Sequence, residues 1–423
     1  MEPRLPRRHR GARDAAGLRR PDAPARRRDP LGRHRDLDVL ERIHGRRRAL
    51  RPARRQGGAG RAVRLAFILA LLALAVPAVA HADRPRWDAR PLATVPPPGY
   101  PARAYVAPNG RIYEGTYDNP SGDTVPSRVF EYLADGTLLR SWTIQGQDLS
   151  QAHGVQVATS DAKGRLVLLD KAPARVILLD PRTGAQTTYA TFADLPALHD
   201  QTPMADYGAW GPDGSLYVTD YQQAVIWRVP PGGGAAQVWL ADKRLDGDMF
   251  GTAGIALAAD HRTLVISQAS SAGLGGGNPA TGRIYTVPIG SDGRPGALTQ
   301  LWESGPAEAP DGLALANSGR IYVALVSPLA NQIVCVGADG KEIDRSPATF
   351  DAPSSVGFLA NSLIVADQSY VNGDPSHMQI LDVAVGEPGI QELIPGRQAK
   401  APAKKKARHK KKHGHRPKQR RRR

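Results

Sequence analysis

Short runs of alternating apolar and polar residues fill the middle of the chain, and they come in pairs joined by a turn. The stretch 310–324 is the clearest example: Leu313 and Leu315 precede an Asn-Ser-Gly turn, and Ile321 and Val323 follow it. Alternation with a period of two is typical of a strand with one buried face, and glycine supplies the positive φ that a tight hairpin needs. The pattern therefore predicts a two-stranded hairpin over residues 310–324.

The same hairpin recurs about every 50 residues, and further strands follow it. The six copies open near residues 104, 154, 208, 254, 312 and 355. Six units of this length are typical of four-stranded propeller blades, which bury their faces only when the blades close into a ring. We predict an all-β, six-bladed β-propeller over residues 100–395, with residues 91–95 adding an outer strand to the last blade. The single cysteine, Cys335, excludes an intrachain disulfide.

Both ends of the chain are basic and lack the alternating pattern. Residues 1–64 hold 21 Lys and Arg against 7 Asp and Glu, and the stretch from Gly396 onward holds 15 Lys and Arg and no acid. Segments of this composition cannot bury a core, so we expect disordered extensions over residues 1–62 and 396–423. Taking +14 and +15 for the two ends from the formal charge of +17 leaves −12 for residues 65–395.

An acidic propeller repels phosphate, so specific nucleic-acid binding is not expected. The polybasic tail is expected to bind an anionic polymer or lipid of the cell envelope. The alternative is a solvated tail without a specific partner.

Residues 63–82 have the parts of a secretory signal peptide. A basic flank precedes an apolar run from Leu65 to Val76, Pro77 ends the run, and Ala80-His81-Ala82 offers small residues for cleavage. We therefore expect a secreted or envelope-associated protein; a retained membrane anchor is the alternative, disfavoured by the shortness of the run. Because a signal peptide begins a chain, we also expect translation to start near Val63. Residues 83–99 form a Pro-rich linker.

Candidate chemistry lies where the inner strands begin, because six loops converge there on the central channel. A purely structural ring would be small and apolar, whereas this ring is largely polar. We predict a small-molecule pocket, with Asp206, Asp311 and His153 as catalytic candidates. The predicted substrate contacts are Arg103, Tyr207 and Ser354. For Asp311 alone, the capping of a turn is an alternative role.

Glu114 is the second unusual residue. It occupies a second-strand position that is aliphatic in the other five blades. A carboxylate at a buried position must be paired or bound to a metal. Glu114 is therefore a candidate metal ligand together with Asp311 and Asp206, and an ion pair with Arg103 is the alternative. An aspartate also ends the second strand in three blades, and its repetition favours a turn-stabilising role for Asp170, Asp220 and Asp367.

Two motifs carry a resemblance to a known family. They are Pro310-Asp311-Gly312-Leu313, followed by Gly319-Arg320-Ile321-Tyr322-Val323, and the stretch 210–220, Trp-Gly-Pro-Asp-Gly-Ser-Leu-Tyr-Val-Thr-Asp. With them, the region 100–390 resembles the senescence-marker-protein/gluconolactonase/regucalcin family, and more broadly the strictosidine-synthase-like six-bladed propellers. The resemblance implies a channel metal, Ca²⁺ or Mg²⁺, that activates water or polarises a lactone carbonyl.

In that family the metal is held by a first-blade Glu, a middle-blade Asn and the Asp of a Pro-Asp-Gly. Asp311 matches the last of these ligands, and Asp206 falls where the family usually has an Asn that contacts substrate. Arg103 and Ala253 stand at the other two ligand positions, so Glu114 or His153 would have to substitute.

Two functions are compatible with this pattern. The first is an exported, metal-dependent hydrolase of a lactone or ester. The alternative is a non-catalytic propeller that binds a small molecule or a protein partner at the cell envelope.

Overall fold

The structure is a computed structural model that describes residues 84–97, 100–117, 124–195, 202–246, 251–269 and 281–397. All of these residues belong to one unit, Val79–Arg423. The predicted N-terminal extension, the predicted signal peptide and nearly all of the basic tail lie outside the described residues. Within the described ranges, no helix is long and apolar enough to cross a membrane.

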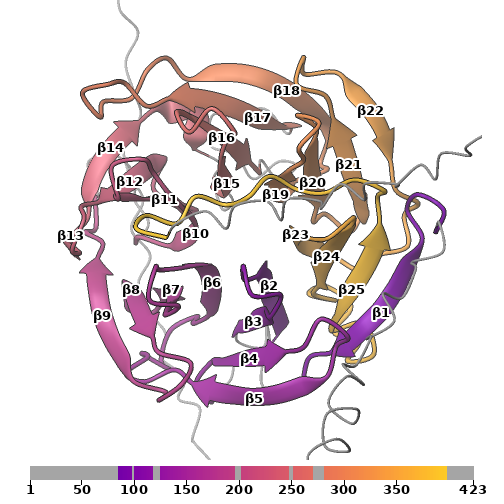
Figure 1. Ribbon diagram of the computed structural model, residues 1–423, viewed down its shortest axis with the longest axis horizontal. Helices are drawn as coiled ribbons and strands as arrows, with labels where there is room; N and C mark the ends of the chain where they lie inside the picture. Colours follow the sequence, from indigo (N-terminus) through magenta and orange to yellow (C-terminus); the bar gives the residue numbers. More distant parts are fainter. Residues whose placement is uncertain are drawn as a thin grey trace, which may run out of the picture. The chain divides into compact units, whose positions relative to one another are not determined.

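Six antiparallel sheets surround a central axis, and in blades 1 to 5 the strands run from the axis outward in chain order (Figure 1). The predicted six-bladed propeller is therefore confirmed. Blade 1 contains β2 (Tyr100–Val106), β3 (Ile112–Tyr117), β4 (Arg128–Tyr132) and β5 (Leu138–Thr143); blade 2 contains β6 (Val155–Ser160), β7 (Leu166–Lys171), β8 (Ala174–Leu179) and β9 (Gln186–Thr191); blade 3 contains β10 (Ala205–Trp210), β11 (Leu216–Asp220), β12 (Val225–Val229) and β14 (Gln237–Ala241).

The second half of the ring repeats this arrangement. A short strand, β13 (Gly234–Ala235), adds in parallel to β9 at the edge of blade 2, and a 3-10 helix, η1 (Lys243–Leu245), follows blade 3. Blade 4 contains β15 (Thr252–Leu257), β16 (Thr263–Gln268), β17 (Thr281–Pro288) and β18 (Thr299–Pro306); blade 5 contains β19 (Pro310–Leu315), β20 (Ile321–Leu325), β21 (Gln332–Val336) and β22 (Glu342–Arg345); blade 6 contains β23 (Pro353–Leu359), β24 (Ser362–Asp367), β25 (Gln379–Ala384) and β1 (Ala89–Thr94).

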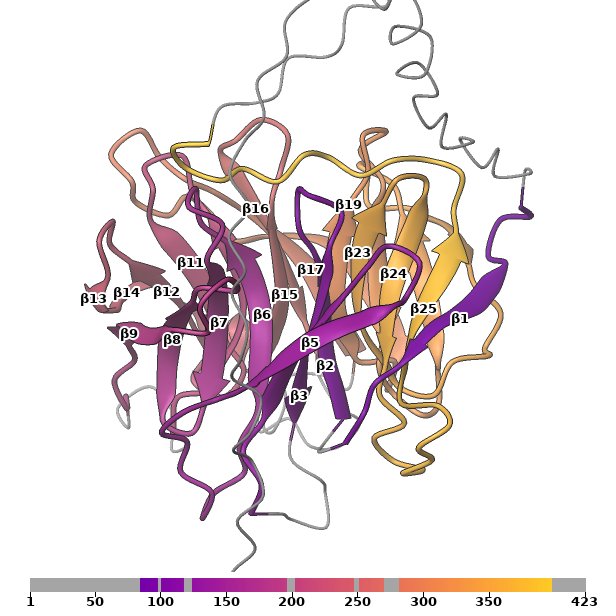
Figure 2. The same cartoon turned by 60° about the horizontal axis from the view of Figure 1, so that its bottom comes forward.

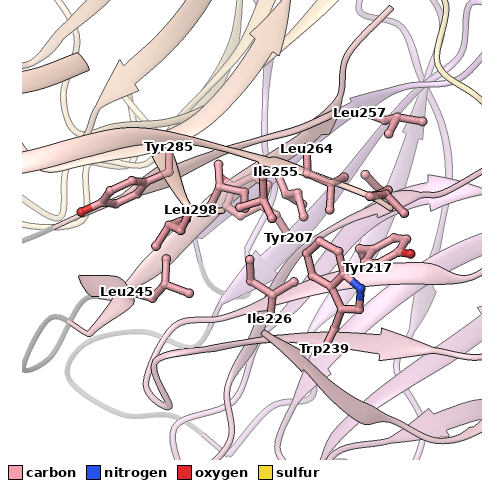
Figure 3. Close-up of a cluster of buried hydrophobic side chains, with 14 of the residues drawn as sticks. Tyr207, Tyr217, Ile226, Trp239, Leu245, Ile255, Leu257, Leu264, Tyr285 and Leu298 are labelled. Atoms are coloured by element: carbon pink, nitrogen blue, oxygen red, sulfur yellow. The ribbon is translucent and has the colours of Figure 1, made fainter. Parts of the chain in front are cut away.

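The hydrophobic core lies between neighbouring blades. Inner strands such as β6 and β10 are buried along their whole length, whereas the outer strand β5 is largely exposed. Between blades 3 and 4, apolar side chains from both sheets interdigitate, among them Ile226, Ile255 and Leu264 (Figure 3). Each blade thus covers its neighbour, which is why an isolated blade would leave its apolar faces in water.

The ring is closed by the N-terminal strand. β1 pairs with β25 from Ala89 opposite Val383 to Thr94 opposite Gln379, which confirms the outer strand expected near residues 91–95. Just before β1, the guanidinium of Arg86 donates two hydrogen bonds, of 2.7 and 3.0 Å, to the Asp344 carboxylate in blade 5. The segment before β1 therefore holds the last two blades together.

The end of the described chain crosses one face of the ring. Residues 386–397, here called the C-terminal strap, run over the turns between first and second strands (Figure 2). Ile390 packs against a core cluster between blades 4 and 5, and Ile394 is buried in the core between blades 2 and 3. The Glu392 carboxylate accepts a hydrogen bond from the Tyr105 hydroxyl at 3.1 Å. The strap occupies this face, and the opposite face holds the starts of the inner strands.

Two truncations separate the strap from the basic tail. Ending the chain after Arg397 should leave the melting temperature unchanged, because the removed stretch is dominated by Lys and Arg and lacks the apolar pattern that could add to the core. Ending it after Val385 should lower the melting temperature by roughly 5–10 °C, because burying each isoleucine contributes about 2 kcal/mol. Calorimetry measures both, and equal melting temperatures for the two truncations would contradict the role given to the strap.

Candidate functional site at the mouth of the central channel

Bulges at the start of the inner strands bring polar residues to the channel. In five inner strands the register shifts within the first residues. The bulge leaves one residue without a partner on the neighbouring strand, or it sets two residues opposite a single partner. A bulge bends the strand and redirects its side chains. The residues in or beside these bulges include Arg103, Asp206, Tyr207, Asp311 and Ser354.

Blade 2 differs from the other blades in the position of its bulge. The residue at its channel position lies three residues after the one that the sequence repeat predicts. The register shift of β6 falls between Val157 and Thr159, and Gln156 pairs with Leu169 one residue into the strand. Gln156 therefore takes the place that was assigned to His153. The His153 ring instead lies within hydrogen-bonding distance of two backbone oxygens, at 2.9 Å from that of Val125. The catalytic role predicted for His153 gains no support from this placement.

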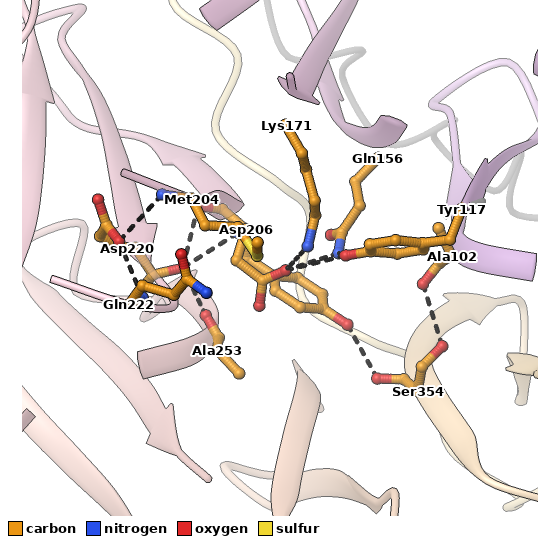
Figure 4. A network of polar contacts seen from close by, with 12 residues as sticks. Ala102, Tyr117, Gln156, Lys171, Met204, Asp206, Asp220, Gln222, Ala253 and Ser354 are labelled. Atoms are coloured by element: carbon orange, nitrogen blue, oxygen red, sulfur yellow. Dashed lines mark hydrogen bonds and ion pairs between the residues drawn. The ribbon is translucent and has the colours of Figure 1, made fainter. Parts of the chain in front are cut away.

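Asp206 is the centre of the polar network at the channel mouth (Figure 4). Its Oδ1 accepts hydrogen bonds from Gln156 Nε2 at 2.7 Å, Lys171 Nζ at 3.2 Å and the Tyr117 hydroxyl at 3.3 Å. Its Oδ2 is buried and has no hydrogen-bond partner within the described part of the chain. One oxygen is therefore fixed by three donors, and the other is free to meet a water molecule or a ligand.

Three residues of this network were missed in the sequence. The Lys171 side chain is 3% exposed, and its ammonium lies 4.1 Å from the centre of the Tyr117 ring and 5.3 Å from that of Tyr221. Tyr117, Lys171 and Tyr221 stand at the end of the second strand of blades 1, 2 and 3. In blades 2 and 3 each follows one of the repeated aspartates, Asp170 and Asp220, so the repeat marked the position.

Tyr207 spans the channel from blade 3 to blade 6. Its hydroxyl donates a hydrogen bond of 2.8 Å to the backbone oxygen of Ser354. Gly312 makes room for it, since a Cβ at that position would lie 2.7 Å from the hydroxyl oxygen. The Arg103 guanidinium stacks on the Tyr207 ring at 4.6 Å, and its Nη1 is buried without a partner in the described residues. The structure thus brings together the three residues predicted to contact substrate.

The two channel carboxyl groups have different electrostatic surroundings. Burial raises the pKa of Asp311 well above its usual range, and the nearby charge of Asp206 raises it further. Burial also raises the pKa of Asp206, but the Lys171 ammonium and its hydrogen bond oppose that shift. The pair titrates as a unit. Asp311 therefore holds its proton more strongly than Asp206, whose ionised form is stabilised by Lys171.

Glu114 is buried beneath the bulge of β2 and does not reach this network. Its Oε1 accepts a hydrogen bond of 2.8 Å from the backbone N–H of Arg103. Burial raises the pKa of Glu114 well above its usual range. The contact expected with Arg103 is therefore made by the backbone, while the guanidinium lies over Tyr207.

The residues present do not fit the divalent metal ion that the sequence resemblance implied. The described residues contain no group of three or more His, Cys, Asp or Glu side chains arranged to hold a metal. Glu114 is engaged at the β2 bulge, and the neighbour of Asp206 is an ammonium group. The three predicted ligands, Glu114, Asp206 and Asp311, are not brought together as a metal site.

The repeated aspartates have structural roles. Asp220 accepts hydrogen bonds of 2.9 Å from the backbone N–H groups of Gln222 and Gln223, and Asp367 accepts one of 2.8 Å from that of Asp351. Asp220 holds the turn after β11, as predicted, whereas Asp367 fixes the segment just before β23 and Asp170 pairs with Arg175 in its own blade.

Three solved structures with the same fold are similar to this chain at low sequence identity. They are a putative gluconolactonase (14% identity, covering 72% of this chain and 94% of that chain, TM-score 0.51), the calcium-binding protein regucalcin from Agrobacterium tumefaciens (16%, 72% and 98%, 0.52) and a luciferin-regenerating enzyme (12%, 70% and 94%, 0.50). No family model matches the chain, and no curated protein matches it. The resemblance to gluconolactonase- and regucalcin-like propellers is thus confirmed, and at these identities it establishes the fold.

Asp367 gives the site face a pH dependence. Burial, reinforced by the charge of Asp351, raises the pKa of Asp367 to about 8. The unfolded chain releases this proton near pH 4, whereas the folded chain retains it until about pH 8. The free energy of unfolding should therefore fall as the pH rises through this window. Asp367→Asn should make the decline of the melting temperature between pH 5 and 8 shallower than in wild type.

The exposed turn residue Asp339 provides the matched control, and Asp339→Asn should keep the wild-type slope. A slope unchanged by Asp367→Asn would show that this carboxyl group does not retain its proton in the folded protein.

Proposed function

We propose that the channel mouth is the active site of a lactonase-like hydrolase that opens a small lactone or cleaves a small ester. The observation that carries the proposal is the asymmetry of two buried carboxyl groups. The ionised form of Asp206 is stabilised by Lys171 and its Oδ2 has no partner in the described residues, whereas Asp311 holds its proton more strongly. A base and an acid in one site are what acyl transfer to water requires.

The reaction follows from these two states. The free Oδ2 of Asp206 takes a proton from a water molecule, whose oxygen adds to the substrate carbonyl carbon. The oxyanion that forms is stabilised by the positive charges of Lys171 and Arg103. The bond from carbon to the leaving oxygen then breaks, and Asp311 gives its proton to that oxygen. The products are an acid and an alcohol, joined in one molecule when the substrate is a lactone, and solvent carries the proton from Asp206 back to Asp311.

Two further buried groups support a ligand at this place. Arg103 Nη1 is a donor, and Gln156 Oε1 is an acceptor; both lack a hydrogen-bond partner in the described residues. Buried polar atoms are nearly always satisfied, so a ligand or water must complete them. A small polar molecule that accepts from Arg103 and donates to Gln156 would do so.

We also propose export of the protein and attachment of its basic tail to an anionic envelope polymer or lipid. The apolar segment at residues 65–76 and the cations from Gly396 onward support this proposal. Such attraction is screened by salt, so it should weaken as the ionic strength rises.

Hydrolysis is tested with a panel of small lactones and aryl esters. Asp206→Asn and Asp311→Asn should each lower kcat/KM by about 10²-fold or more, which is typical for the loss of a general acid or base. The wild-type pH profile should be bell-shaped, since activity needs Asp206 ionised and Asp311 protonated. Asp311→Asn should remove the fall in rate on the alkaline side.

Asp339→Asn, far from the channel, should retain wild-type rates. Binding of panel compounds without turnover, unaffected by either channel substitution, would favour the non-catalytic propeller over the hydrolase.

A further inference from the structure

The channel carries a positive charge that belongs to the chain itself. Asp206 and Asp311 are 2% and 9% exposed. Two carboxyl groups that are this deeply buried need a nearby cation, or they must share a proton so that only one of them is charged. In regucalcin, described as a calcium-binding protein, the same fold accompanies a metal ion. Here the cation in contact with Asp206 is the ammonium of Lys171, at 3.2 Å.

Lys171 is held in place on several sides. Its backbone N–H donates a hydrogen bond of 3.0 Å to the oxygen of Gly154, and its ammonium lies over the rings of Tyr117 and Tyr221. An aromatic face attracts a cation and replaces part of its lost hydration. The ammonium is thus placed between two aromatic rings and a carboxylate in a site that leaves its side chain almost entirely buried.

A divalent ion at Asp206 would have to bind the free Oδ2, close to the ammonium of Lys171. Oδ1 already accepts three hydrogen bonds, and the second cation of the channel, Arg103, stacks on Tyr207. A metal ion would face repulsion from both positive side chains at reduced dielectric. With no three-ligand group in the described residues, the channel offers it no compensating set of ligands.

We propose that Lys171 is the resident cation of this channel and takes the electrostatic role of a divalent metal. The inference rests on the proposed function only for the identity of the reaction, because the charge balance of the channel holds with or without substrate. It follows that the protein is stable and active without added metal, and that removal of the ammonium leaves a vacancy for another small cation.

The test compares the melting temperature of the chelator-treated protein with and without millimolar Ca²⁺ or Mg²⁺. Wild type and the exposed control Lys163→Ala should show no shift. Lys171→Ala should melt roughly 5–10 °C lower than wild type, because it leaves a buried charge without its partner. Added ethylammonium should restore part of the loss in Lys171→Ala, since it refills the vacancy with the same charged group, and should not affect Lys163→Ala.

A rise in the wild-type melting temperature with Ca²⁺ or Mg²⁺ would overturn the inference, and this arm needs no variant to fold. Ethylammonium that leaves Lys171→Ala unchanged would also count against it. The two proposals fail separately. Hydrolysis that requires calcium would refute the resident cation but keep the hydrolase. Metal-independent stability without any turnover would refute the hydrolase but keep the resident cation.

Discussion

The whole structure depends on the non-covalent closure of the ring, in which the pairing of β1 with β25 takes part. Every blade buries its apolar faces against two neighbours, so an open ring would expose two of them at once. No intrachain disulfide can lock the ring, because the single cysteine, Cys335, is buried in blade 5. The ladder of β1, the Arg86 contacts to blade 5 and the C-terminal strap share that role. Closure also assembles the site, since its residues come from blades that lie across the ring from one another.

The closed ring creates the electrostatic problem that defines the channel. Carboxyl groups brought near the axis lose water on all sides, and each must find a donor, a cation or a proton. The structure uses all three solutions. Glu114 accepts a hydrogen bond from the backbone N–H of Arg103, Asp206 pairs with Lys171, and burial raises the pKa of Asp311, which favours its protonated form. Tyr207 and the glycine that admits it, Gly312, close the space around these groups and keep the dielectric low.

The fold could be predicted from the sequence because its information is local. Period-two alternation and glycine turns mark each hairpin, and their recurrence gives the blade count. The site was less accessible, because a bulge shifts register without changing the apolar pattern. In β6 the bulge lies further along the strand, so the sequence pattern pointed to His153 for the channel position that Gln156 occupies in the structure. Tyr117, Lys171 and Tyr221 lie at strand ends, where the alternation stops, so only the neighbouring repeated aspartates marked them.

A lysine in place of a divalent ion restricts the chemistry of the channel. A single charge at a given distance attracts an oxyanion half as strongly as a double charge, and an ammonium does not bond directly to the carbonyl oxygen as a Lewis acid does. The remaining stabilisation has to come from Arg103 and from proton transfer by Asp311. Substrates whose carbonyl is already activated, such as strained lactones or esters of acidic alcohols, need the least additional polarisation. In compensation, a covalently attached cation is always present and is correctly placed whenever the ring is closed. The site therefore polarises a carbonyl less strongly than a metal ion would, but it does not depend on a supply of metal. This agrees with a channel in which a fixed ammonium is paired with a carboxylate that has one oxygen free.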